Sequence, residues 1–419
     1  MKYMRVALIT ITMLLAAHCL FGCRVVNRTI TDKAYEALPE KQARFGWVGG
    51  RTYKLDDESL AETPFEGAAE FQGVQVSYQN RLGEQAQHIA EHLAYVTQTV
   101  GGEIALEFTH QPHAYLLRVD EAPDNVKINL KVDPNSMPLP LFVEAGREDW
   151  RTILADSTIF PYAIIHEITE ASLVMPREGK PVAPDLAVQS LVPLGLVVKN
   201  YTRWFRDGLA NYAGYIAFKA SAPHIDYPPG TASLHRRPFS ALAKVGDDLF
   251  KWHQYSDESK SGDYYNAALG LFLLIEHRYG SQAIRDMVIG KDALEFADGA
   301  AMIELANATL RTDIEKLAEN FDFPQTGLGL APVTRAAVLN QDLPVDSGLC
   351  VTAVESGSIA EAAAIQKGDV ITHVAGLPIQ HQLDFERAIF EHLAADAVPV
   401  AVRRGQESIT WELKLAPGK

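Results

Sequence analysis

The chain has little cysteine. Three cysteines occur among 419 residues, and Cys19 and Cys23 lie within the first 23 of them. Small secreted domains that depend on disulfides are rich in cysteine, whereas a chain of this length can bury a sufficient core without them. Cys350 stands between Leu349 and Val351 in an apolar strand pattern, so we expect a small core residue there; a nucleophilic thiol is the alternative. The composition therefore argues against a fold held together by disulfides.

Positive charge is also scarce. Lys and Arg number 38 against 53 Asp and Glu, which gives a formal net charge of −15 at pH 7. A surface of this sign repels nucleic acid and anionic lipid headgroups. Neither is expected as a binding partner, and attachment to a membrane would require a lipid rather than a basic patch.

The N-terminal apolar run, Val6 to Leu15, is too short to span a bilayer comfortably. It follows a basic start, a pattern typical of a secretory signal peptide. Leu20-Phe21-Gly22-Cys23 resembles the bacterial lipobox, which implies a signal over residues 1–22 and acylation of Cys23. Arg24 resembles an outer-membrane sorting signal, so the resemblance implies a lipid-anchored, periplasm-facing protein of the bacterial cell envelope, in the outer membrane of a Gram-negative source. A soluble secreted protein or an uncleaved anchor is the alternative.

The pentapeptide His166-Glu167-Ile168-Thr169-Glu170 is the most informative motif. The apolar residues around it are spaced for a buried helix. Positions i and i+4 of a helix share a face, so the His166 imidazole and the Glu170 carboxylate can converge on one ion, with Glu167 about 100° around the helix. Burial of these groups is costly unless a cation or hydrogen bonds compensate it. The alternative is an ordinary helix whose acidic residues face water.

Three stretches together resemble the gluzincin zinc metallopeptidases over roughly residues 75–320. The pentapeptide resembles their zinc-binding helix, with Glu170 in place of the second histidine; residues 201–212 resemble their second signature, with Asp207 at the glutamate position; residues 263–280 resemble a later helix that ends in Tyr-Gly. The resemblance implies a function for each matching position. It makes His166, Glu170 and Asp207 metal ligands, Glu167 the general base, Asn211 a residue that orients the ligand histidine, and Tyr264 or Tyr265 the donor to the oxyanion.

The ligand set implied by this resemblance departs from the family at two positions. His, Glu and Asp carry two negative charges, one more than His, His and Glu. Zinc accepts carboxylate oxygens, but Mn²⁺ or Mg²⁺ competes better for such a set, and the extra charge weakens the Lewis acidity of the metal. The expected cofactor is therefore zinc or another divalent metal, and a site that has lost its metal is the alternative.

The order of elements predicts an α+β fold. Strands are predicted at 74–78, 115–119, 126–130 and 139–143, a helix at 85–96, and mostly helices from the motif to about residue 320. A small mixed sheet followed by helices is the layout expected of the zincin-like fold. Residues 23–73 mix charges with Gly and Pro and are expected to form a tether and lead-in. The peptidase-like domain would then occupy residues 74–322.

Residues 323–419 are predicted to form a separate module. Gly327-Leu328-Gly329-Leu330, residues 348–362 and residues 365–371 strongly resemble a bacterial PDZ domain, a barrel-like β fold, with a helix at 383–393 and a strand at 398–403. PDZ domains add an extended peptide as a strand to a sheet edge, and loop amides bind its terminal carboxylate. The resemblance implies that the amides of Leu328, Gly329 and Leu330 bind peptide. A module that only packs against the first domain is the alternative.

The two modules in this order resemble the glycyl-aminopeptidase type of family, without its long N-terminal β domain, so its specificity is not carried over. The sequence predicts a membrane-anchored metallopeptidase that hydrolyses peptide bonds in peptide or protein substrates with a metal-activated water. The PDZ domain would select the substrate or regulate the enzyme by binding a C-terminal or internal peptide. A catalytically inactive pseudopeptidase that acts as a PDZ peptide-binding adaptor is the alternative.

Overall fold

The computed structural model describes residues 65–173 except 80, 110, 119–137, 144–145, 147 and 158–159; residues 201–227 and 236–253; residues 261–333 except 293 and 295–298; and residues 345–415 except 346. The segment that resembles a lipobox, with Cys23, and the strand predicted at 126–130 lie outside the described residues. Within these ranges no helix has both the length and the apolar character that crossing a membrane requires.

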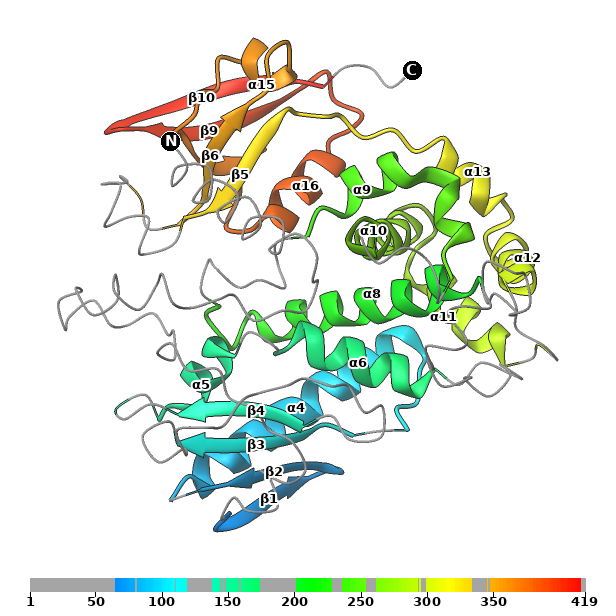
Figure 1. The fold of residues 1–419 in the computed structure, drawn as a ribbon, viewed down its shortest axis with the longest axis vertical. Coiled ribbons are helices and arrows are strands. Elements are labelled where there is room, and N and C mark those ends of the chain that lie inside the picture. Colours follow the sequence, from blue (N-terminus) through cyan, green and yellow to red (C-terminus); the bar gives the residue numbers. More distant parts are fainter. Residues whose placement is uncertain are drawn as a thin grey trace, which may run out of the picture.

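A four-stranded sheet of mixed direction begins the described chain (Figure 1). Its strands, in spatial order, are β1 (Gly67–Phe71), β2 (Val74–Tyr78), β3 (His113–Arg118) and β4 (Pro138–Val143). The first pair is antiparallel and the other two pairs are parallel. Helix α4 (Gly83–Ile104) packs on this sheet because its buried residues recur every three or four positions, which gives it one apolar face.

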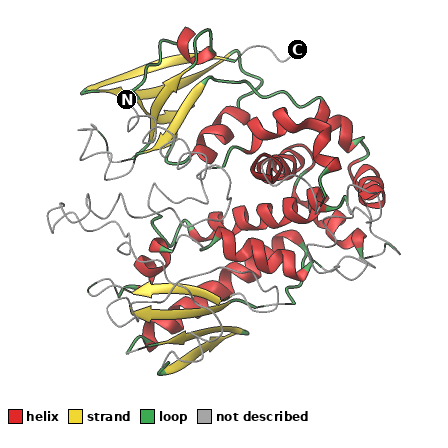
Figure 2. Ribbon diagram, viewed as in Figure 1, coloured by secondary structure: helices red, strands yellow, loops and turns green. Residues whose placement is uncertain are grey.

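Helices make up the rest of the first part of the chain. They are α5 (Trp150–Asp156), α6 (Tyr162–Ser172), α8 (Arg203–Ser221), α9 (Pro238–Val245), the 3-10 helix η5 (Gly246–Lys251), α10 (Ser261–Tyr279), α11 (Ser281–Lys291), α12 (Gly299–Leu310) and α13 (Ile314–Glu319). Figure 2 shows how these helices separate the first sheet from a second one. A mixed sheet followed by helices, with a further sheet at the C-terminal end, confirms the predicted α+β class.

Helix α8 lies between α6 and α10, and two of its glycines allow a close approach on either side. A Cβ atom at Gly214 would lie 2.7 Å from the carbonyl oxygen of Tyr162 on α6. A Cβ atom at Gly208 would lie 2.7 Å from the ring of Phe272 on α10. Carbon atoms this close to other heavy atoms clash, so both positions require glycine if the three helices keep this packing. These helices carry the candidate site described below.

The second sheet contains the C-terminal strands in the order β10-β9-β7-β6-β5, with the short β8 paired to β7. The strands are β5 (Leu328–Pro332), β6 (Leu349–Val354), β7 (Val370–Val374), β8 (Leu377–Pro378), β9 (Ala397–Arg404) and β10 (Glu407–Lys414), and the helices are α15 (Ile359–Ala362) and α16 (Gln382–Phe390). Cys350 is a free, half-buried thiol on β6, and burial raises its pKa. A thiol with a raised pKa forms less thiolate, which fits a packing role better than a nucleophilic one.

The two parts of the chain meet where α16 packs against α9 (Figure 1). The rings of Phe239 and Phe390 stack with centroids 4.0 Å apart. Beside them the buried carboxylate of Glu386 accepts hydrogen bonds from the backbone N–H groups of Phe239, at 2.8 Å, and Ser240, at 3.3 Å. These amides begin α9, and the N-terminal end of a helix favours a negative charge. An aromatic stack and a buried carboxylate therefore hold the two parts together.

Protonation of Glu386 should control the strength of this interface. Burial raises the pKa of its carboxyl from 4.5 to about 7, although Ser240, the two amides and Arg237 oppose the shift. Because the folded state holds this proton more tightly than the unfolded state, the group stabilises the fold fully below pH 4.5. This contribution is lost as the pH rises through 7. Between pH 5 and pH 8 we expect the free energy of unfolding to fall by up to about 3 kcal/mol from this group.

The variant Glu386→Gln tests this dependence, because both amide hydrogen bonds go to a single oxygen, Oε2, which the Gln amide oxygen can replace. Urea unfolding at pH 5, 6.5 and 8 should show a flatter pH profile for Glu386→Gln than for the wild type. Glu412→Gln, at an exposed position of β10, serves as the control and should keep the wild-type profile. An unchanged profile in Glu386→Gln would contradict the assignment.

Candidate functional site

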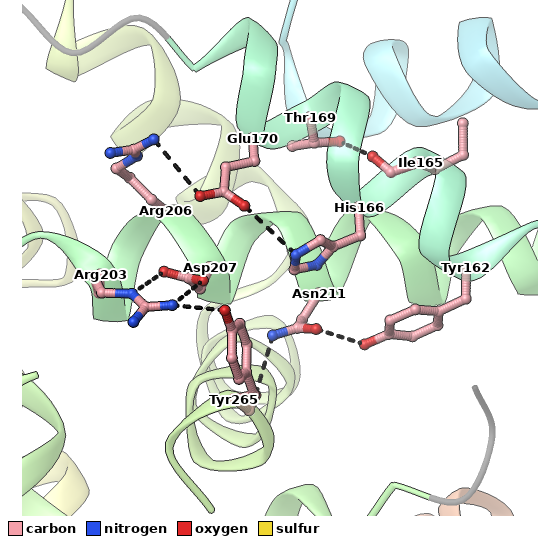
Figure 3. Close-up of polar contacts among 10 residues, drawn as sticks. All are labelled: Tyr162, Ile165, His166, Thr169, Glu170, Arg203, Arg206, Asp207, Asn211 and Tyr265. Atoms are coloured by element: carbon pink, nitrogen blue, oxygen red, sulfur yellow. Dashed lines mark hydrogen bonds and ion pairs between the residues drawn. The ribbon is translucent and has the colours of Figure 1, made fainter. Parts of the chain in front are cut away.

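Helices α6 and α8 bring the three predicted ligand residues together (Figure 3). His166 and Glu170 project from one face of α6, one turn apart, and their Nε2 and Oε2 atoms are 3.7 Å apart. Asp207 projects from α8 toward them, and one ligand atom from each of the three residues lies within 4.8 Å of the others. The pairing of His166 with Glu170 follows from the helical repeat, whereas the position of Asp207 depends on how α6 packs against α8.

The site is shielded from water to different degrees. Asp207 is 1% exposed, while the side chains of His166 and Glu170 are 11% and 32% exposed. Burial lowers the pKa of His166 against the opposing charges of Glu167 and Asp207, so the imidazole is neutral near pH 7. A neutral imidazole is the form that binds metals. Its Nδ1 atom is buried and has no hydrogen-bond partner among the residues that the structure describes.

Two arginines of α8 bind the carboxylates of this site. Arg203 donates from Nε to Oδ2 of Asp207, at 3.0 Å, and from Nη2 to Oδ1, at 3.1 Å, a bidentate pair of the strong, charge-assisted kind. Nη2 of Arg206 lies 3.6 Å from Oε1 of Glu170. Sequence reasoning missed both arginines. The spacing of Arg203 and Asp207, i to i+4 on one helix, could have indicated the first pair; the second joins two helices and had no such signal.

Glu167 lies beside this cluster, in the first turn of the motif. Burial raises the pKa of its carboxyl, and the charges of Glu170 and Asp207 raise it further against the opposing effect of His166. A carboxylate whose protonated form is favoured accepts a proton more readily than a fully solvated one. The position and the environment therefore suit a general base.

The structure distinguishes the two candidate tyrosines. The hydroxyl of Tyr265 on α10 accepts a hydrogen bond from Nη2 of Arg203 at 2.6 Å, and its ring centroid lies 6.2 Å from that of His166. Burial raises the pKa of Tyr265, so it stays protonated at neutral pH. Tyr264 instead stacks on Trp252, with centroids 5.6 Å apart. Burial raises the pKa of Tyr264, and charges on η5 have a smaller effect on it. Of these two alternatives, Tyr265 therefore lies at the site.

Asn211, one turn after Asp207, occupies the centre of the hydrogen-bond network. It is fully buried, accepts a hydrogen bond from the Tyr162 hydroxyl at 3.2 Å, and donates to the backbone carbonyl of Tyr265 at 3.1 Å. It also favours the protonated form of His166, although burial outweighs this effect on the pKa of the imidazole. The amide thus links α6, α8 and α10. Its predicted role in orienting His166 stays a prediction, because Nδ1 of that imidazole has no hydrogen-bond partner among the described residues.

The donor set fits a divalent cation in chemistry and approaches the spacing that one requires. Ligand atoms about 2.0–2.2 Å from a tetrahedral Zn²⁺ lie roughly 3.3–3.6 Å apart. The Nε2 to Oε2 distance of 3.7 Å between His166 and Glu170 already approaches this spacing, and the 4.8 Å limit for the whole set requires a movement of about 1 Å. Each carboxylate oxygen bound to an arginine retains a second lone pair. The arginines therefore reduce the negative charge available to a metal, which would have to use the remaining lone pairs.

The proposed peptide-binding residues lie in a strand rather than in a loop. Leu328, Gly329 and Leu330 begin β5, the last strand at one edge of the second sheet, and Gly327 precedes them with φ +72. A Cβ atom at Gly327 would also lie 2.2 Å from Cβ of Ser358, so both the backbone conformation and the space require glycine. This edge strand is the element to which an extended peptide would add.

Comparison with known proteins identifies the C-terminal module. The PDZ domain family model matches residues 327–415, so the chain contains a C-terminal PDZ domain, as the sequence predicted. The serine protease Do-like HtrA of Lactococcus lactis subsp. lactis (strain IL1403) is 31% identical over 110 residues, which is 25% of this chain and 27% of that protein. The chain therefore matches only about a quarter of the length of this curated relative.

Two solved structures are similar to parts of the chain. The crystal structure of the HtrA3 PDZ domain bound to a phage-derived ligand (FGRWV) shares 25% identity, with 22% of this chain and 84% of that one covered, at a TM-score of 0.20. An aminopeptidase N family protein from Idiomarina loihiensis shares 13% identity, with 84% of this chain and 67% of that one covered, at a TM-score of 0.33. Likeness at this level carries no conclusion about activity, which has to come from the site itself.

Proposed function

We propose that this chain is a metal-dependent peptidase with a zincin-like catalytic domain and a PDZ domain that binds peptide ends. One observation carries the proposal: His166, Glu170 and Asp207, from two helices, converge within 4.8 Å of one another. Glu167 lies on the same helix as two of them, and burial, followed by the charges of Glu170 and Asp207, raises the pKa of its carboxyl. A cluster of this composition supports metal-assisted hydrolysis.

A divalent cation held by His166, Glu170 and Asp207 would polarise a peptide carbonyl and increase the acidity of a water molecule. Glu167 would accept the proton of the attacking water and pass it to the amine that leaves. Tyr265, protonated at neutral pH, would donate a hydrogen bond to the developing oxyanion. Arg203 holds both the Asp207 carboxylate and the Tyr265 hydroxyl, so it fixes a ligand and a donor relative to each other.

The resemblance of residues 20–23 to a lipobox supports the proposal that the protein is anchored by lipid at Cys23 to the bacterial envelope and faces the periplasm. Its substrates would then be peptides or proteins of that compartment. The PDZ domain would take an extended peptide along β5, with the backbone of Leu328, Gly329 and Leu330 providing hydrogen bonds. The peptide ends that the PDZ domain binds would then determine which substrates are selected or how cleavage is regulated.

A second candidate function is favoured by the arginine pairs. Asp207 is fully buried and its two oxygens bind Arg203, while Glu170 is near Arg206, so the carboxylates already have counter-charges. A fold that keeps such a site without hydrolysing peptides would serve as an adaptor through its PDZ domain. The two functions differ in whether the donor set binds a metal.

Substitution at the altered ligand position tests the proposal. Glu170→His removes one negative charge and adds a softer ligand, so zinc affinity should rise by at least about tenfold, and zinc-dependent hydrolysis of a peptide library should rise with it. Zinc affinity is measured by competition with a chromophoric chelator. Glu304→His, at an exposed helical position of α12, is the matched control and should change neither quantity. No change in zinc affinity, together with no hydrolysis by either protein, would contradict the peptidase function and favour the adaptor function.

A further inference from the structure

Helix α16 of the PDZ domain is hydrogen-bonded to the edge strand β5. Gln382 is the first residue of α16, and its side-chain amide donates from Nε2 to the backbone carbonyl of Leu330 on β5 at 2.8 Å. β5 is the edge strand, so its free backbone groups are those that an added peptide strand would pair with. One of these acceptors is therefore already used by a side chain of the same domain.

The other end of the same amide contacts the first domain. Oε1 of Gln382 accepts a hydrogen bond from Nε of Arg237, the residue before α9, at 3.2 Å. The backbone N–H of Arg237 donates to Oδ1 of Asn266, at 3.4 Å, one residue after Tyr265 on α10. The preceding residue, Arg236, lies over the ring of Tyr162, 5.1 Å from its centroid. The two arginines thus connect the peptide-binding edge with the residues around His166.

We propose that Gln382 is an internal latch of the PDZ domain, released when a peptide carboxyl terminus pairs with β5. A peptide N–H that pairs with the Leu330 carbonyl competes with the Gln382 amide for this acceptor. An amide displaced in this way no longer holds Arg237. Binding of peptide would thereby free residues 236 and 237, next to the candidate active site. The proposal rests on the proposed binding of peptides by this domain.

The rest of the interface remains when the latch opens. The stack of Phe239 on Phe390 and the bonds from the α9 amides to Glu386 involve other positions of α16. They lie one and two turns beyond Gln382, so displacement of its side chain does not break them. The latch can therefore change the position of Arg237 while the two parts of the chain stay docked.

Peptide affinity measures the latch directly. The full mature chain is used to select a ligand from a library of peptides with free carboxyl termini, and the dissociation constant is then measured for each variant. Gln382→Ala should bind the ligand about three- to tenfold more tightly, because the peptide no longer competes with one or two hydrogen bonds. Gln382→Glu cannot donate to the Leu330 carbonyl and should also bind more tightly. Gln380→Ala, the same change at an exposed position, is the control and should match the wild type.

Hydrogen exchange at residues 236–245 provides a second measurement. Adding peptide to the wild type should increase exchange at the amides of Arg236 and Arg237 but not at those of Phe239 and Ser240, which stay bonded to Glu386. Gln382→Ala should show the increased exchange before peptide is added. Equal or weaker binding by Gln382→Ala would overturn the latch while leaving peptide binding by the domain intact. Failure of every variant to bind any peptide would overturn the proposed peptide binding, and the latch with it.

Discussion

Glu167→Gln is expected to reduce metal-dependent peptide hydrolysis by about 10²–10⁴-fold, the usual contribution of a positioned general base. The amide cannot accept the proton of the attacking water. Glu167 is not one of the three ligand residues, so the bound metal per chain should be unchanged. Stability should not fall either, because the substitution removes a charge that is repelled by Glu170 and Asp207.

The measurement compares initial rates of peptide cleavage and the metal content of wild type and variant after identical purification. Glu304→Gln, on the exposed face of α12, controls for loss of a helical glutamate and should be fully active. A variant that cleaves peptides as fast as the wild type would show that Glu167 is not the base. A variant that loses its metal as well would place Glu167 among the ligands.

Arg203→Met is expected to lower the free energy of unfolding by about 3–5 kcal/mol in the presence of a chelator. The reason is the burial of its partner: Asp207 is 1% exposed, and the substitution leaves its charge without the bidentate arginine. A divalent metal that binds the same carboxylate should restore part of this loss, by an amount that grows with metal concentration. Urea unfolding with chelator and with zinc measures both effects.

Arg206→Met is the matched control on the same helix. Its partner Glu170 is 32% exposed and 3.6 Å away, so water screens the pair and its loss should cost at most about 1 kcal/mol. Equal stability of Arg203→Met and the wild type under chelation would contradict the role given to the Arg203–Asp207 pair. Destabilisation that zinc does not reverse would show that the carboxylate needs the arginine and does not bind zinc.

Much of the fold could be predicted from local pattern. The predicted strand at 74–78 is β2, and the helix predicted at 383–393 corresponds to α16, which ends three residues earlier. Helix α4 extends to Ile104, well beyond the predicted end at 96, through Gly101 and Gly102. Glycine disfavours a helix interior, but Val100 and Ile104 are buried against the core, and this packing outweighs the local preference.

The candidate site was less accessible to sequence reasoning. The convergence of His166 and Glu170 follows from helix geometry alone, whereas the placement of Asp207 required a resemblance to a family. The choice of Tyr265 over Tyr264 depends on how α10 is rotated against α8, which no local pattern reveals. Gln382 joins residues 52 and 145 positions away in the sequence, so its contacts follow only from the tertiary fold.

Zinc titration of the metal-free mature protein tests most directly whether His166, Glu170 and Asp207 form a metal site. Isothermal titration calorimetry should show one zinc ion per chain, with binding abolished in His166→Ala and strongly weakened in Asp207→Asn. Zinc binding that is absent, or that is the same in all three proteins, would contradict the assignment of His166, Glu170 and Asp207 as a zinc site.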